Sequence, residues 1–200
     1  MEVMVAIAVA LLLIGGGALV LAVRSRREGA RDERSDAWAY VQSVAEEVGG
    51  LSVIADDDGW PRLCGLAAGV PVEIDGNNVV GALREPRLGL RCYLASAAEA
   101  PNAAVWLGEV PALHTEFGRP SPLGDPDGLF EVHTRAESSG SDWWSEPDLQ
   151  EALLSLPGAG LLLVDGHLTV VFAELDAHSV RVALSIPETI ERGVSRVTLH

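Results

Sequence analysis

The chain has 200 residues, of which 29 are acidic and 14 are basic, and its formal net charge at pH 7 is -15. Every basic residue is arginine, and there is no lysine. This excludes a Walker A phosphate loop, a Schiff-base enzyme, a kinase-type ATP site and an S-x-x-K serine acylase, because each depends on a lysine amine. Arginine in place of lysine, with abundant Ala, Gly, Val and Leu, favours a GC-rich bacterial source.

An uninterrupted apolar segment runs from Val3 to Val23, and twelve of its twenty-one residues are Val, Leu or Ile. As a helix with a rise of ~1.5 Å per residue it would be about 31 Å long, close to the ~30 Å hydrocarbon core of a bilayer. A cleaved signal peptide would need a positively charged start and a shorter apolar core. We therefore predict an uncleaved transmembrane helix in residues 1–23 and a single-pass protein of the cell membrane.

Arginines follow the apolar segment but do not precede it, and they lie within an Arg-rich linker at residues 24–35. Basic residues that flank a span tend to remain in the cytoplasm, so we expect the rest of the chain to be cytoplasmic. Three of these arginines directly follow the span and are expected at the membrane surface, where anionic lipid head groups attract them. They are Arg24, Arg26 and Arg27.

Residues 36–200 carry 25 acidic side chains and 9 arginines, which give a formal charge of −16. Residues 1–35 carry four acidic side chains and five arginines, which give a charge of +1. About 165 residues suffice for one domain with its own core. Such an acidic domain repels nucleic acid, so we expect no nucleic-acid partner. The partners expected instead are the lipid bilayer and an unknown protein.

The first half of this domain shows a helix followed by strands. Asp36 to Val48 has an apolar stripe of helical period and ends at Gly49-Gly50. Apolar side chains then alternate along Val70–Asp75 and Leu88–Ala95, which predicts two strands. The turn residues Asp75 to Asn78 lie between them and favour antiparallel neighbours.

A Gly- and Pro-rich loop, Gly118 to Gly128, precedes the second half, where a strand is predicted at Leu129–Arg135. Residues 145–148 form a capping-box pattern, with Trp144 placed to pack on Leu149, and the helix that follows ends at Pro157-Gly158.

Asp165-Gly166 separates two apolar runs and predicts a hairpin of Leu161–Val164 with His167–Ala173, in which Leu163 and Leu168 share a face. Alternation from Val180 to Ile186 favours a further strand, with a helix as the alternative, and Pro187 could begin a short closing helix. The fold class is α+β: one domain with a mainly antiparallel sheet of six to eight strands and two or three packed helices.

Cys64 and Cys92 are too few and too far apart for a C-x-x-C pair or a zinc site, and both have apolar neighbours. We expect two buried thiols in a reducing compartment, and a disulfide becomes plausible if the topology is reversed. Asp56 to Gly59 and Asp125 to Gly128 resemble pieces of calcium loops but lack the later ligands, so they are interpreted as turns. No metal or other cofactor is expected.

Glu131, His133 and Arg135 occupy alternate positions of a predicted strand and should share one face. They are the best candidates for catalytic residues, because a carboxylate can orient an imidazole for acid-base work. The alternative is the solvated face of a sheet whose other face carries Phe130 and Val132.

Trp143 precedes the tryptophan of the capping pattern and follows a Ser- and Gly-rich stretch. If exposed, it is a candidate anchor for a protein partner, since aromatic side chains often dominate interface energies. The alternative is a lid over the core.

These features favour a membrane-anchored, non-catalytic binding or scaffolding domain at the inner membrane face. The main alternative is a membrane-tethered hydrolase or metal-dependent enzyme that uses carboxylate and His side chains. An envelope sensor would require the opposite topology.

Overall fold

The structure is a computed structural model that describes residues 33–75, 88–107, 129–134 and 143–197. The chain divides into two compact units, Met1–Tyr40 and Val41–His200. The predicted transmembrane helix and Arg24, Arg26 and Arg27 lie outside the described residues. Within the described ranges, no helix has the length and apolar character needed to cross a bilayer.

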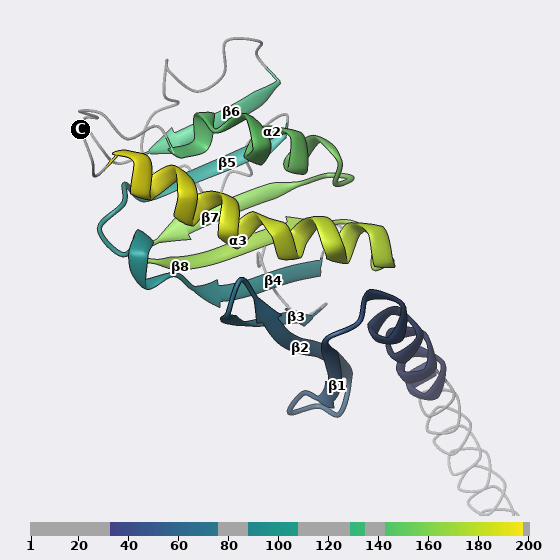
Figure 1. Cartoon of the computed structure of the whole chain (residues 1–200). Helices are drawn as coiled ribbons and strands as arrows, with labels where there is room; N and C mark the ends of the chain where they lie inside the picture. The colour runs from purple at the N-terminus through teal and green to yellow at the C-terminus, as the bar shows by residue number, and fades with distance from the viewer. Residues whose placement is uncertain (1–32, 76–87, 108–128, 135–142, 198–200) are drawn as a thin grey trace, which may run out of the picture. The chain divides into compact units, whose positions relative to one another are not determined.

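In the part of the chain that the structure describes, eight strands form one antiparallel sheet in the order β1-β2-β3-β4-β8-β7-β5-β6 (Figure 1). In chain order they are β1 Leu51–Ala55, β2 Pro61–Ala67, β3 Val70–Asp75, β4 Leu88–Tyr93, β5 Ala103–Leu107, β6 Phe130–Thr134, β7 Gly160–Val164 and β8 His167–Phe172. The expected α+β class and antiparallel sheet are confirmed.

Three α-helices are described: one that includes residues 33–48, α2 at Pro147–Leu154 and α3 at Ala177–Val197. Two 3-10 turns, η1 at Ala95–Ala97 and η3 at Trp143–Ser145, connect elements of the sheet and of the helical layer. The α2 and α3 helices lie on the same face of the sheet (Figure 1). The predicted helix at Asp36–Val48 is confirmed, and its end is joined to α3 because the Arg181 guanidinium donates to the Glu47 carbonyl oxygen at 2.6 Å.

The core lies between the sheet and these helices. One apolar row crosses seven strands through directly paired positions, and every member is buried: Leu63, Ile74, Leu90, Val170, Leu161, Val105 and Val132. The α3 helix covers the row with Val180, Ala183, Ile186 and Ile190, whose spacing of three or four places them on one helical face. Fully burying one such side chain contributes roughly 1.5–3 kcal/mol.

The predicted hairpin of β7 and β8 is confirmed. Leu163 lies opposite Leu168, and both are buried. Asp165 and Gly166 have φ angles of 49° and 80°, the left-handed conformation that a type I′ turn requires at both central positions. Asn102 fixes this turn, because its side-chain oxygen accepts from the Asp165 N–H at 2.8 Å.

The strand predicted at Val180–Ile186 is wrong, because these residues belong to α3. An alternating pattern of Val, Leu and Ile is compatible with both structures, and in the helix Val182 and Leu184 are half-buried at the margins of the apolar face. The closing helix does not begin at Pro187 either, since Pro187 lies inside α3. A proline there removes the backbone bond to the carbonyl of Ala183, a cost that burial of the helix must offset.

The capping box at residues 145–148 is also wrong, although the helix after it is confirmed. Ser145 belongs to η3, and the residue that caps α2 is Glu146, which makes no side-chain capping bond. Pro147 begins the helix, a position where its missing N–H is not required. Trp144 and Leu149 are both buried in the core, as a staple between them would require.

The first turn of α3 is capped by Asp176, whose Oδ1 accepts from the Ser179 N–H at 2.7 Å. This hydrogen bond lowers the pKa of the Asp176 carboxyl, so its stabilising effect is present above the unfolded-state pKa and is lost as the pH falls through the folded-state pKa.

We predict that Asp176→Ala lowers the free energy of unfolding by about 1 kcal/mol at pH 7. The difference from the wild type should shrink on acidification below the ordinary Asp pKa of about 3.9.

Urea denaturation of the purified chain at neutral and acidic pH measures both effects. Glu174→Ala removes an exposed carboxylate two residues earlier and serves as the control, with an expected change within about 0.5 kcal/mol. A variant Asp176→Ala that unfolds at the wild-type urea concentration at pH 7 would contradict the assignment.

Candidate functional site

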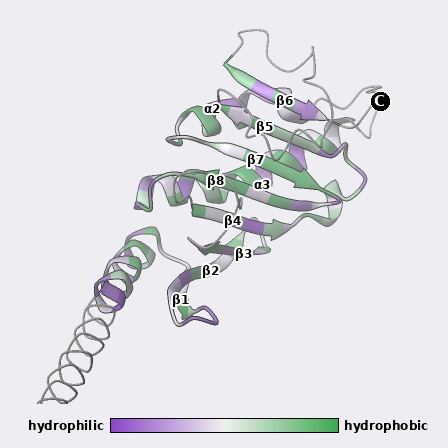
Figure 2. Ribbon diagram, turned by 180° about the vertical axis from the view of Figure 1, so that it is seen from behind, coloured by the Kyte–Doolittle hydropathy of each residue, from purple (hydrophilic) through white to green (hydrophobic). Residues whose placement is uncertain are grey.

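The face of the sheet opposite α2 and α3 carries no helix among the described residues. This face is turned toward the viewer in Figure 2. Its two halves differ. Across β5, β7 and β8 it holds a second apolar cluster of Ala104, Trp106 and Val171. Across β2, β3 and β4 it carries charged and exposed apolar side chains, which makes that half the candidate for contact with a partner.

The apolar half is shaped by the contact of Trp106 with Gly160. These residues are directly paired on β5 and β7, and a Cβ atom at position 160 would overlap the indole ring. Only glycine therefore allows the ring to lie flat against the β7 backbone at this point. The indole ring and Val171 are both buried, so this part of the face is closed.

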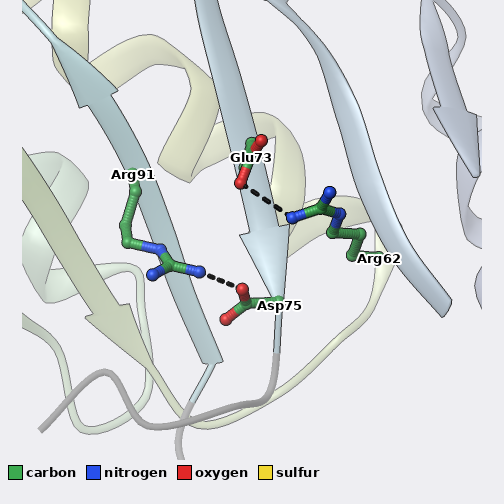
Figure 3. Close-up of polar contacts among 4 residues, drawn as sticks. All are labelled: Arg62, Glu73, Asp75 and Arg91. Carbon is green, nitrogen blue, oxygen red and sulfur yellow. Dashed lines mark hydrogen bonds and ion pairs between the residues drawn. The ribbon is translucent and has the colours of Figure 1, made fainter. Parts of the chain in front are cut away.

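Two ion pairs cross the other half (Figure 3). Arg62 on β2 donates to Glu73 on β3 with an Nη1–Oε2 distance of 3.2 Å, and Arg91 on β4 donates to Asp75 on β3. Glu73 also lies directly opposite Arg91 in the strand register. Opposite charges on adjacent strands stabilise a sheet by ~0.2–1 kcal/mol per pair, so this cluster adds modestly to the pairing of β2, β3 and β4.

Two polar atoms in this cluster have no hydrogen-bond partner among the described residues. The Asp75 Oδ1 and the Arg62 Nε are both buried, although each side chain uses another atom in an ion pair. A buried carboxylate oxygen without a donor costs free energy, and the Arg91 contact at its other oxygen offsets that cost. The other side chains of the cluster remain partly exposed and present both charge signs at the surface.

Apolar side chains stand exposed beside the ion pairs. Leu66 on β2 is 65% exposed and Tyr93 on β4 is 50% exposed, and both belong to the face that bears the ion pairs. The Tyr93 ring contacts the His167 ring of β8 in a tilted arrangement, with ring centroids 5.0 Å apart. An exposed apolar group bordered by paired charges is a composition typical of protein–protein contact surfaces.

The predicted cluster on β6 is brought together in part. Glu131 and His133 share a face and contact each other, with an Oε1–Nε2 distance of 2.7 Å. Arg135 lies outside the described residues. The His133 side chain is only 5% exposed, so the alternative of a fully solvated row does not hold for it. Acid-base catalysis also requires access of the imidazole to substrate, which this burial restricts.

Trp143, a candidate partner anchor only if exposed, is buried. Its side chain is 1% exposed, its Nε1 donates to the Pro101 carbonyl oxygen at 3.1 Å, and its ring meets Trp144 edge to face. It belongs to the same core cluster as Leu149 of α2 and Ile190 of α3. Trp143 therefore acts as the lid over the core and is not presented as a surface anchor.

Asp56 to Gly59 forms the turn between β1 and β2. The Asp56 Oδ1 accepts from the N–H groups of Asp58 and Trp60 at 3.0 and 2.7 Å, which is the usual role of Asp in a turn. In the part of the chain that the structure describes, no three His, Cys, Asp or Glu side chains gather as metal ligands. The Asp125 to Gly128 stretch lies outside that part.

Comparisons of the chain with protein-family models, with curated proteins and with solved structures found no match.

The two cysteines are free thiols in unequal environments: Cys92 is buried on the helix-covered side, whereas Cys64 is half-buried on the other. Burial raises the pKa of Cys92 to about 12, and burial followed by the charge of Glu73 raises the pKa of Cys64.

Because the thiolate is the reactive form, we predict that Cys64 reacts slowly with Ellman's reagent at pH 8 and that Cys92 reacts only after unfolding in urea.

Absorbance of the thiolate released from Ellman's reagent measures the reaction of Cys64 in the native chain and of Cys92 after unfolding. Cys64→Ala should abolish the reaction of the native chain, and Cys92→Ala should leave it unchanged. Native-state labelling of Cys92 ahead of Cys64 would show that the helical layer does not protect β4 as described.

Proposed function

We propose that this chain is a single-pass membrane protein whose residues 36–200 form a non-catalytic domain that binds a protein partner at the inner membrane face. The observation that carries the binding role is the partly exposed half of the sheet face around Leu66 and Tyr93. A sheet face that served only stability would be more completely covered or more uniformly polar.

The tether is supported by the sequence. The apolar segment from Val3 to Val23 has the length and composition of a transmembrane helix, and the arginines that follow it favour a cytoplasmic domain. The strong negative charge of residues 36–200 favours a partner with a basic surface and disfavours nucleic acid or anionic lipid.

An enzymatic role is the alternative, and the Glu131–His133 contact is the observation that favours it. A carboxylate that contacts one imidazole nitrogen holds the ring in a fixed orientation, as in many hydrolases. The burial of His133 favours the binding role, since a structural His commonly satisfies a neighbouring carboxylate.

Membrane topology is tested with a reporter fused after His200. We predict fluorescence from a reporter that is active only in the cytoplasm, and no activity from one that requires export. Replacing Arg24, Arg26 and Arg27 by Gln should weaken this preference, because the orientation depends on them. Activity of the exported reporter alone would overturn the proposed compartment.

Partner binding is tested by site-specific photocrosslinking of the full chain in its native membrane. A photoreactive phenylalanine at position 66 should yield a discrete adduct that Tyr93→Asp reduces about tenfold, since a charge is placed in the proposed contact. Leu154 on α2 is 49% exposed and provides the matched control on the other side of the sheet. Equal adducts from positions 66 and 154, or none from position 66, would count against a binding face here.

A further inference from the structure

Among the strands that the structure describes, β1 forms one edge of the sheet and pairs with β2 alone. The direction of its backbone groups follows from the turn, where the Asp56 N–H donates to the Trp60 carbonyl oxygen at 2.8 Å. Hydrogen-bonded and non-hydrogen-bonded pairs alternate along an antiparallel ladder, so the next pair, Ala55 with Pro61, is non-hydrogen-bonded. Pro61 fits that position because it has no N–H to donate.

The same alternation continues along β1. Leu51, Val53 and Ala55 therefore direct their N–H and C=O groups away from β2, toward the open edge. Within the described chain, no other strand, helix or side chain hydrogen-bonds to these three residues. The edge presents an alternating series of donors and acceptors.

The composition of β1 leaves this edge unprotected. Natural edge strands are commonly blocked by a charge, a proline or a bulge, and the sequence LSVIA contains neither a charge nor a proline and pairs with β2 in continuous register. The opposite edge is different: β6 carries the Glu131–His133 ion pair, and five of the residues from Leu129 to Thr134 make further contacts. Self-association by strand addition is therefore favoured at β1 and not at β6.

We propose that two copies of this chain associate through β1, paired antiparallel about a two-fold axis at Val53. In this register Val53 faces Val53 of the second copy, and Leu51 faces its Ala55. All three outward-directed residues of each copy then form hydrogen-bonded pairs. A shift of two residues in either direction leaves a residue of β1 opposite Asp57 or Gly49, outside the strand of the second copy.

The side chains agree with a second copy as the occupant. The two-fold axis places Ser52 opposite Ile54 on the face of the ion pairs and joins apolar residues on the helix-covered face, where Leu51 and Val53 already pack against the core. No charged residues oppose each other within the paired strands, and Asp56 faces Gly50 of the second copy. The strand is thus complementary to itself in both hydrogen bonding and polarity.

The register is tested by disulfide formation between two differently tagged full-length copies. Both carry Cys64→Ala, because Cys64 lies directly opposite Ser52 on β2 and would compete. One copy carries Ser52→Cys and the other Ile54→Cys. These positions form a non-hydrogen-bonded pair with Cα atoms ~4.5 Å apart, within the reach of a disulfide.

We expect mild oxidation to link Ser52→Cys of one copy to Ile54→Cys of the other at least tenfold more than it links two copies that both carry Ser52→Cys. In the proposed register the two residues at position 52 are diagonal neighbours ~7–8 Å apart. Cys92 stays in place, because its burial and its pKa of about 12 keep it unreactive. Equal linkage of the mixed and identical pairs, linkage of Ile54→Cys only with itself, or no linkage would each overturn the proposed pairing.

A second measurement avoids cysteine. Ser52→Lys with Ile54→Lys places like charges opposite each other twice across the axis, whereas Ser52→Glu with Ile54→Lys places opposite charges there. Both positions are exposed, so folding should be retained. Sedimentation of the full chain in detergent should show the first variant dissociating about tenfold more readily than the second.

Equal masses for the two variants would refute the interface. The result is distinguishable from failure of the proposed partner binding, because that role depends on Leu66 and Tyr93 and not on the edge of β1.

Discussion

The packing of α3 on the apolar row that crosses the sheet is the interaction on which the rest of the structure depends. Leu90 and Val170 lie at the centre of that row, and Ile186 of α3 is buried with them in one core. The sheet joins strands far apart in the sequence, since β4 pairs with β8 and β5 with β7. Burial under a single helix of 21 residues offsets the entropy of closing those long connections.

The face of the sheet opposite the helices differs in composition between its two halves. Its β5–β7–β8 half is closed by Trp106, whose ring lies against the backbone of Gly160. Its β2–β3–β4 half carries the ion pairs of Arg62 with Glu73 and of Arg91 with Asp75. The difference arises because the first half uses apolar contact and the second uses charges that remain partly hydrated. The proposed partner would displace water from exposed Leu66 and Tyr93 without breaking the core.

The two edges of the sheet are likewise unequal. Five uncharged residues at β1 leave donors and acceptors directed outward, whereas β6 carries a carboxylate–imidazole contact. An antiparallel sheet with one blocked edge and one open edge favours closed pairing of two copies over open-ended growth, because addition at β1 uses up the available edge. The proposed self-pairing and the proposed partner binding would then occupy separate surfaces of one domain.

The sequence by itself determined the local elements whose signals are short-range: the helix at Asp36–Val48, the alternation in β3 and β4, and the Asp165-Gly166 hairpin. It also placed Glu131 and His133 on one face, because strand periodicity requires it. Tertiary structure decided whether Val180–Ile186 became strand or helix, since its β-branched residues locally favour a strand and packing against the sheet selects the helix. Only the tertiary structure buried Trp143, paired Arg62 with Glu73 and left β1 at the edge of the sheet. The reason is that strand order depends on contacts between distant residues, which local periodicity does not encode.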